Sequence, residues 1–380
     1  MAQLKTIFGI CICLSVSVTG CKEIYKPDII SAPVSYLVVE GVLNAGGGPT
    51  NIRLTRTFKL DDSARLRSER NAQVSVEGKD NITRTLGMTG DGLYTSPDLN
   101  LTYNEEYRLR IKTSDGKEYE SSYITALRTP PIDSLGFREE AEVVQVYVNS
   151  HDVTNATRYY RWDFDETWEI RSYYFSQYKY VNGQVVDRTA ADDVSICWKY
   201  NSAKNITLGS TTSLASDIVY RAPLIFIPRG DEKLAVRYSI LARQYAMDKK
   251  GYAYYELMKK NTETLGTIFD AQPSEAIGNI KCITNPAEPV IGYVTSSSIE
   301  EKRFFINAGE LTNWRFFQDC PMGQVPNHPD SIRVAYESGQ SIFAGHYPDF
   351  GTRPDFYYMS YKPCVECPAR GGLLQKPSYW

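Results

Sequence analysis

The stretch EEYRLRIKTSDGKEYESS, residues 105–122, decides the fold class of this chain. Apolar and polar residues alternate on both sides of Asp115-Gly116, and a period of two places successive side chains on opposite faces of a strand. An Asp-Gly pair between two alternating runs is a strong signal for a tight hairpin turn. The stretch therefore predicts two antiparallel strands joined at Asp115-Gly116.

Similar short runs lie on both sides of this hairpin. SYLVVEGVLN (35–44) ends at the turn-rich NAGGGPT (44–50), and NIRLTRTF (51–58), AQVSVEG (72–78) and GDGLYTS (90–96) follow. Six or seven short strands within about a hundred residues are typical of a β-sandwich. The pattern predicts an immunoglobulin-like or transthyretin-like β-sandwich over residues 36–130. The Pro-Pro pair in LRTPPIDSLGF (127–137) ends it, so we place the boundary at 129–132.

Residues 131–380 are predicted to form a larger β-rich domain, and its first strands are unusually aromatic. In YYRWDFDETWEIR (159–171), Tyr160, Trp162 and Phe164 fall on one strand face, and Tyr173 follows in the next segment. On an open face these four aromatic residues would be candidates for binding a sugar or another flat ligand. The alternative is cross-strand packing inside a large sheet.

One segment changes from strand to helix periodicity. In DKKGYAYYELMKKNTETLGTIF (248–269) apolar and aromatic residues recur near helical spacing, and Asp248 is suited to the N-cap. We predict a helix near 248–262. The final stretch, 311–380, is expected to be loop-rich and stapled by cysteines.

The leader contains LSVSVTGCKEIYKPD (14–28), where an apolar stretch ends at Gly20-Cys21. The apolar part, residues 7–18, is too short to span a bilayer as a helix. Small residues before Cys21 resemble the site that the lipoprotein signal peptidase cuts. We predict a signal peptide over 1–20, cleavage between Gly20 and Cys21, lipidation of Cys21 with diacylglycerol and palmitate, and a tether over 21–35. Cys21 would then anchor the chain in a lipid bilayer.

Eight cysteines occur, of which Cys11 and Cys13 lie in the leader and Cys21 would carry lipid. In an oxidising compartment the remaining ones are candidates for disulfides, and their odd number leaves at least one thiol without an internal partner. The five are Cys197, Cys282, Cys320, Cys364 and Cys367. We expect one bridge from Cys320 to Cys364 or Cys367, and a second from Cys197 to Cys282.

The pair Cys364 and Cys367 also has the CxxC spacing of a zinc knuckle or a redox motif. Zinc would need two further ligands, for which Cys320, His328 and His346 are the nearby candidates. Redox chemistry would need the motif at a helix start, whereas prolines flank it here. Structural disulfides are the preferred interpretation.

No catalytic signature is present in the sequence. Nucleophile-elbow, zincin, P-loop and dinucleotide-binding motifs are all missing. Asp163 and Asp165 resemble half of a glycosidase acid pair, but at i and i+2 of one strand they simply share a face. The formal net charge of −3 and the lack of a basic run argue against a nucleic-acid partner. We therefore predict no enzyme activity, no resident metal and no cofactor.

Several stretches together resemble a known family. They are the Gly-Cys leader, YLVVEGVLN, DGKEYESS, PPIDSL, the long segment beginning FDAQPSEAIGNIKC, and the ending CVECPARGGLLQKPSYW (364–380). The chain resembles the Bacteroidota lipoprotein family catalogued as domain of unknown function 4249. This resemblance implies an outer-membrane lipoprotein with an N-terminal β-sandwich, commonly encoded beside a TonB-dependent receptor. It implies no reaction and no catalytic residues.

The resemblance leads to two functional hypotheses. In the first, the protein is an accessory lid or ligand-capture component of a TonB-dependent nutrient-uptake system, with the receptor as its partner. In the second, it is a cell-surface adhesion or structural module without a transport role. Both place it at the outer membrane, lipid-anchored and facing the cell exterior.

Overall fold

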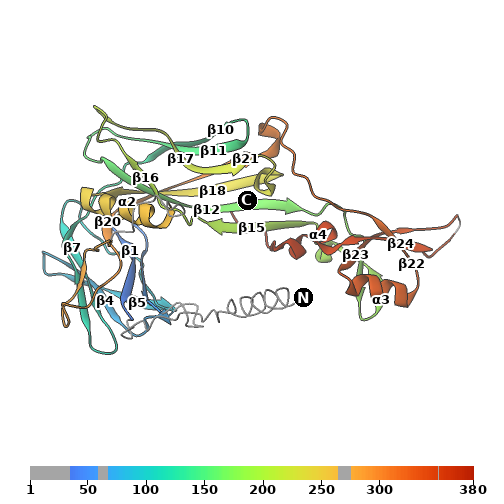
Figure 1. Cartoon of the computed structure of the whole chain (residues 1–380), viewed down its shortest axis with the longest axis horizontal. Coiled ribbons are helices and arrows are strands. Elements are labelled where there is room, and N and C mark those ends of the chain that lie inside the picture. Colours follow the sequence, from blue (N-terminus) through green and yellow to red (C-terminus); the bar gives the residue numbers. More distant parts are fainter. Residues whose placement is uncertain (1–34, 59–66, 264–274, 350) are drawn as a thin grey trace, which may run out of the picture.

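A computed structural model describes residues 35–58, 67–263, 275–349 and 351–380. The predicted signal peptide, the cleavage site at Gly20 and the lipidation site at Cys21 lie outside the described residues. The fold is mainly β and elongated, and three parts follow one another along its long axis (Figure 1). A β-sandwich containing β1, β4, β5 and β7 lies at one end, a second sandwich lies in the middle, and a small C-terminal lobe lies at the other end.

The first part is a curved sheet of eleven strands that encloses its own apolar core. Its path runs β19-β8-β7-β4-β5-β6-β2-β1-β20, with β3 beside β2 and β9 beside β7. The N-terminal strands are β1 (Leu37–Asn44), β2 (Thr50–Arg56), β3 (Arg67–Ser68), β4 (Gln73–Gly78), β5 (Thr83–Gly90), β6 (Leu93–Ser96), β7 (Glu106–Lys112), β8 (Glu118–Ser121) and β9 (Ile124–Thr125).

The predicted hairpin at Asp115-Gly116 is confirmed. β7 and β8 pair antiparallel, and Gly116 has a φ of 87°, a backbone conformation that a residue without a Cβ adopts easily. Two later strands complete this sheet: β19 (Ile280–Cys282) pairs with β8, and β20 (Thr295–Ser297) runs parallel to β1. The expectation that residues 131–380 form a separate domain is thus wrong for these strands, because Ile280, Cys282 and Val294 fill the first core.

The second part is a sandwich of a three-stranded and a five-stranded sheet around a separate core. The smaller sheet has the order β10-β11-β17, and the larger one the order β15-β12-β18-β21 with β16 also on β12. Their bounds are β10 (Ile132–Glu139), β11 (Val143–Asp152), β12 (Tyr159–Arg171), β15 (Ile196–Ser202), β16 (Thr207–Ser210), β17 (Asp217–Pro228), β18 (Arg237–Met247) and β21 (Ile299–Asn307).

A buried polar network joins the two sandwiches where the chain crosses between them. The Thr129 amide donates to Ser298 Oγ at 2.9 Å, and the Ala246 amide donates to Thr129 Oγ1 at 3.0 Å. The fully buried Gln244 donates to the Pro130 carbonyl at 2.7 Å and accepts from the Trp162 indole at 2.8 Å. Because these buried groups satisfy one another, the relative placement of the sandwiches is fixed by hydrogen bonds.

The predicted helix is present as α2 (Lys249–Glu263) and lies at this junction (Figure 1). Asp248 caps it, because its carboxylate accepts from the Gly251 amide at 2.8 Å. Tyrosines connect α2 to both sandwiches: Tyr252 packs on Tyr159, and Tyr254 packs on Tyr293 with ring centroids 5.1 Å apart. No helix among the described residues is long and apolar enough to span a membrane.

The C-terminal lobe contains more regular structure than the loop-rich segment that we expected. Its sheet has the order β22-β24-β23, and the β13-β14 hairpin packs against β23. The bounds in the lobe are β13 (Tyr178–Val181), β14 (Gln184–Asp187), β22 (Gly323–Pro326), α3 (Pro329–Glu337), β23 (Gln340–His346), β24 (Phe356–Tyr361) and α4 (Lys362–Val365). Over all the described residues there are four short 3₁₀ turns: η1 (Ala190–Asp192), η2 (Glu232–Leu234), η3 (Ala308–Glu310) and η4 (Cys367–Arg370).

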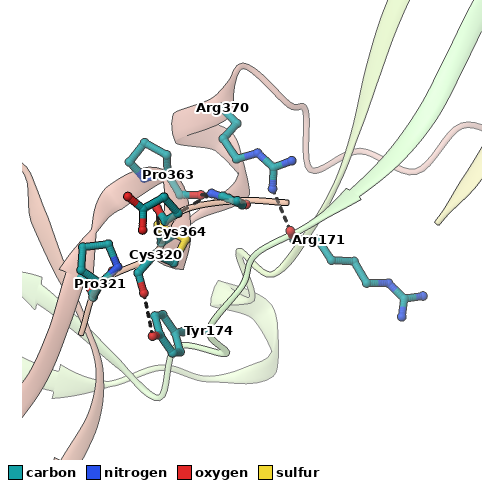
Figure 2. Close-up of a disulfide and its surroundings, with 10 residues drawn as sticks. Arg171, Tyr174, Cys320, Pro321, Pro363, Cys364 and Arg370 are labelled. Carbon is teal, nitrogen blue, oxygen red and sulfur yellow. Dashed lines mark hydrogen bonds between the residues drawn. A yellow bond between two sulfur atoms is a disulfide. The ribbon is translucent and has the colours of Figure 1, made fainter. Parts of the chain in front are cut away.

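Two disulfides fasten this lobe. Cys320 bonds Cys364, and Figure 2 shows the Tyr174 hydroxyl donating to the Cys320 carbonyl at 2.9 Å beside it. Cys367 bonds Cys197 on β15. The expected Cys320–Cys364 bridge is therefore confirmed.

The expected Cys197–Cys282 bridge is wrong, because β19 carries Cys282 into the first core, where it is buried with a free thiol. Cys364 and Cys367 belong to different bridges, so the CxxC motif has no thiolates to offer for zinc binding or for redox exchange within the motif.

The glycines after the CxxC motif have a packing role. A Cβ on Gly372 would lie 2.5 Å from Cys197 Cβ and 2.9 Å from Ile170 Cδ1. Only a residue without a side chain lets the backbone pass this close to the Cys197–Cys367 bridge. Beyond it the chain continues across the large sheet, where the Leu373 and Trp198 amides exchange hydrogen bonds of 2.9 Å.

Candidate functional site: a polar cleft between the sandwiches

A cleft of about 660 Å³ lies between the first sandwich and the outer face of the large sheet of the second. Side chains from β12, β18 and β21 form one wall. The end of β1 and the turn that follows it form the other wall. The lining residues are Gly41, Val42, Asn44, Gly47, Pro49, Asn51, Arg161, Asp163, Arg243, Tyr245, Ile299 and Glu301. A volume of roughly 300–1,000 Å³ is usual for small-molecule sites.

Arg161 is the most deeply placed cation of this cleft, with a side chain only 19% exposed. Its guanidinium lies 4.4 Å from the ring centre of Tyr245 and 5.0 Å from that of Tyr255 on α2. The nearest carboxylate, Asp163, is 3.9 Å away, which is too far for a hydrogen bond. Two aromatic faces thus hold the charge in place while the Arg161–Asp163 ion pair stays loose.

Arg243 is paired much more completely. Its guanidinium contacts Asp165 at 2.5 Å, Glu301 at 2.7 Å and Asp163 at 3.3 Å. Burial would raise the pKa of the Asp165 carboxyl, but hydrogen bonds from Ser202 and Arg243 outweigh it and hold the pKa below the usual range. Arg243 therefore ties the three strands of this wall together at one point.

The turn on the opposite wall is held by Asn44, which is almost fully buried. The side-chain oxygen Oδ1 of Asn44 accepts a hydrogen bond from the Gly46 amide at 2.9 Å, and the backbone amide of Asn44 donates to Thr50 Oγ1 at 2.9 Å. Asn51 on the adjacent strand accepts from Thr95 Oγ1 at 2.8 Å. Because both walls are braced by hydrogen bonds, the cleft is largely formed before any ligand arrives.

The four aromatic residues predicted as ligand-binding candidates lie elsewhere. Tyr160, Trp162 and Phe164 are buried in the second core, on the face of β12 that is opposite to the cleft. Tyr160 stacks on Trp162 with ring centres 5.6 Å apart, and its hydroxyl donates to the buried Asp217. For these three the surface interpretation is wrong and core packing is correct. Tyr173 alone is exposed, next to Tyr174 near the lobe.

Of the acidic pair predicted as half of a glycosidase site, Asp163 lines the cleft, and Asp165 lies next to it on the same strand. Asp163 and Asp165 share a strand face, as expected, and both contact Arg243. A general acid for glycoside hydrolysis needs a raised pKa, whereas the pKa of Asp165 is lowered. The pair therefore serves as an anchor for the Arg243 guanidinium.

One buried carboxylate escaped the sequence-based reasoning. Glu166 lies on the core face of β12, where its oxygens accept from Lys233 Nζ at 2.8 and 2.9 Å and from the Tyr238 hydroxyl at 2.9 Å. Burial, together with the Glu166 charge, raises the pKa of Tyr238. The sequence does indicate that Glu166 is on the core face, because it follows Trp162 and Phe164 at the same two-residue spacing.

Two packed sandwiches with a braced polar cleft at their junction define the architecture as a mainly β, double-sandwich protein. The chain belongs to the family described as "Domain of unknown function (DUF4249)", whose model matches residues 22–303. The matched range includes β1 to β20 and the start of β21, and hence the whole lining of the cleft. The ending at 364–380 lies beyond it.

Other comparisons add little. No curated protein matches the chain. Among solved structures, the chicken interferon gamma receptor alpha chain is 10% identical, covers 57% of this chain and 91% of its own, and has a TM-score of 0.14. A putative carbohydrate binding protein from Bacteroides uniformis is 11% identical, with the same coverages and the same TM-score. Likenesses this low support no conclusion about function.

Proposed function

We propose that the protein is a lipid-anchored ligand-capture component of a TonB-dependent nutrient-uptake system in the outer membrane. The observation that carries the capture role is the braced polar cleft, whose two walls come from different sandwiches. A cleft fixed by a buried hydrogen-bond network binds without a large ordering cost. The receptor partner and the outward orientation are supported by the family resemblance and the leader.

The proposed anchor is Cys21, and the first described residue is Ser35. Fourteen residues, 22–35, reach at most about 50 Å when extended. A tether of this length would let the sandwiches stand clear of the lipid headgroups. Acyl chains on one cysteine would give a stable attachment, because each buried methylene contributes about 0.8 kcal/mol.

Cell fractionation tests the anchor. Replacement of Cys21 by Ser should move the folded protein from the membrane fraction to the soluble fraction, whereas Cys282→Ser, on a thiol that carries no lipid, should leave the protein in the membrane. Protease added to intact cells should digest the wild-type protein if it faces outward. Membrane retention of the Cys21 variant would contradict the anchor, and full protection from protease would contradict the outward orientation.

A second function, surface adhesion, is favoured by one specific observation. Several large apolar side chains are exposed on or near the C-terminal lobe. They are Tyr173, Phe175, Phe317 and Met322, with Phe317 as much as 84% exposed. Deletion of the gene separates the two functions: slower growth on one nutrient with normal attachment supports capture, and loss of attachment with normal growth supports adhesion.

A further inference from the structure

The charges that line the cleft cancel. Arg161 and Arg243 are positive, and Asp163 and Glu301 are negative, so the formal sum is zero. A charged ligand would bring an uncompensated charge into a partly desolvated site, which is unfavourable unless it is matched. A neutral ligand with many polar groups meets no such cost.

Arg161 has donor capacity that the protein uses only in part. A guanidinium carries five N–H groups. Among the described residues, the Tyr245 hydroxyl oxygen accepts a hydrogen bond from this guanidinium, and Asp163 Oδ2 lies 3.9 Å from Nη2. Contact with the Tyr245 and Tyr255 rings limits the motion of the group, so hydrogen bonds from its other N–H groups to a ligand cost little further entropy.

Asp163 supplies the matching acceptor. Its Oδ1 faces Arg243 at 3.3 Å, its Oδ2 faces the loosely paired Arg161, and the side chain is 36% exposed. Arg161 and Asp163 are two residues apart on β12, so they stand side by side on one strand face. A hydroxyl both donates and accepts, and two adjacent hydroxyls could accept from Arg161 and donate to Asp163 together.

We infer that this cleft binds a neutral polyhydroxylated ligand of the saccharide class, with Arg161 and Asp163 as the residues that select it. The inference rests on the proposed capture function and gives that function its ligand class. Arg243 takes no part in selection, because its three carboxylate partners occupy it.

Isothermal titration calorimetry on the purified chain beginning at residue 22 tests the inference. The probes are neutral trisaccharides of glucose, mannose, galactose and xylose at millimolar concentration, with diglycine as a zwitterion and inorganic phosphate as an anion. At least one trisaccharide should bind, and diglycine and phosphate should not. If no trisaccharide binds, or if only diglycine or phosphate binds, the inference is wrong.

Variants then locate the binding. Arg161→Met should weaken the trisaccharide about tenfold or more, because it removes hydrogen bonds from a charged donor. Asp163→Asn keeps the side-chain shape and should also weaken binding, so it decides the matter if Arg161→Met does not fold. Arg171→Met, an exposed arginine at the end of the same strand, should leave affinity unchanged. Unchanged affinity in the first two variants would place the sugar outside this cleft.

Failure of the saccharide-binding inference can be told apart from failure of the proposed capture function. A receptor that co-purifies with the protein supports capture whichever ligand class the cleft takes. Conversely, a sugar that binds this cleft in a protein without a receptor partner would keep the ligand class and remove the transport role.

Discussion

The Cys197–Cys367 bridge ties the end of the C-terminal lobe to the large sheet, and its removal allows a quantitative test of the fold. The two cysteines are 170 residues apart and fully buried, on β15 and η4. The perturbation is the double variant Cys197→Ser with Cys367→Ser. The matched variant, Cys320→Ser with Cys364→Ser, removes a bridge that spans only 44 residues.

The expected magnitudes follow from chain entropy. Closing a loop of 170 residues lowers the entropy of the unfolded chain by an amount worth about 5 kcal/mol at 25 °C, and closing 44 residues is worth about 4 kcal/mol. The shorter loop lies inside the longer one, so with the inner bridge intact the outer loop is effectively 170 − 44 = 126 residues. This lowers the outer value by less than about 0.5 kcal/mol.

Urea denaturation of the oxidised chain beginning at residue 22 measures these values. The outer variant should lose about 4–5 kcal/mol of unfolding free energy and the inner variant slightly less, about 4 kcal/mol. Thiol titration of the unfolded wild type should find one free thiol, at Cys282. A loss below about 1 kcal/mol in the outer variant would refute the entropic reasoning. A peptide map that joins Cys197 to Cys282 would refute the pairing itself.

Three further predictions concern the second sandwich. Glu166→Ala should lower the unfolding free energy by about 3–5 kcal/mol, measured in urea, because Lys233 would lose its buried partner; a loss below about 1 kcal/mol would contradict this. The pKa of the Asp165 carboxyl is lowered in the folded protein, so its charge stabilises the fold at pH values above its unfolded pKa of about 3.9, and this stabilisation is lost as the pH falls through the folded pKa. Asp165→Asn should therefore make the unfolding free energy fall less steeply with decreasing pH. An equally steep fall in the variant and the wild type would disprove this role. Gly372→Ala should cost about 1–3 kcal/mol by overpacking on Cys197, whereas Gly309→Ala, with open space around its position, should cost less; equal thermal melting temperatures would count against the close approach.

Elements that form between residues close together in the sequence were predicted correctly from the sequence pattern. The Asp115-Gly116 hairpin and the helix near 248–262 follow from turn chemistry and from a period of 3.6, both of which act between neighbours in the chain. The turn after β1 was equally visible, because its glycines and proline mark it. Each of these features forms from residues that are close in sequence.

What could not be predicted depends on contacts between distant segments. Alternation along β12 shows that Trp162 and Asp163 face opposite sides, but it does not say which side is covered. The return of β19 to the first sheet decides that Cys282 is buried beside β8, far from Cys197, and no spacing in the sequence carries that information. The cleft has the same origin, since its walls come from residues 41–51, 161–163, 243–245 and 299–301.

Our central proposal is that this protein works with a TonB-dependent receptor, and co-purification tests it most directly. The full chain, tagged at its C-terminus, is extracted from outer membranes in mild detergent, with the soluble Cys21→Ser variant as the matched control for membrane context. We expect a TonB-dependent receptor to elute with the wild-type protein in stoichiometric amount. Elution of the wild-type protein as a lone, lipid-anchored monomer would contradict it.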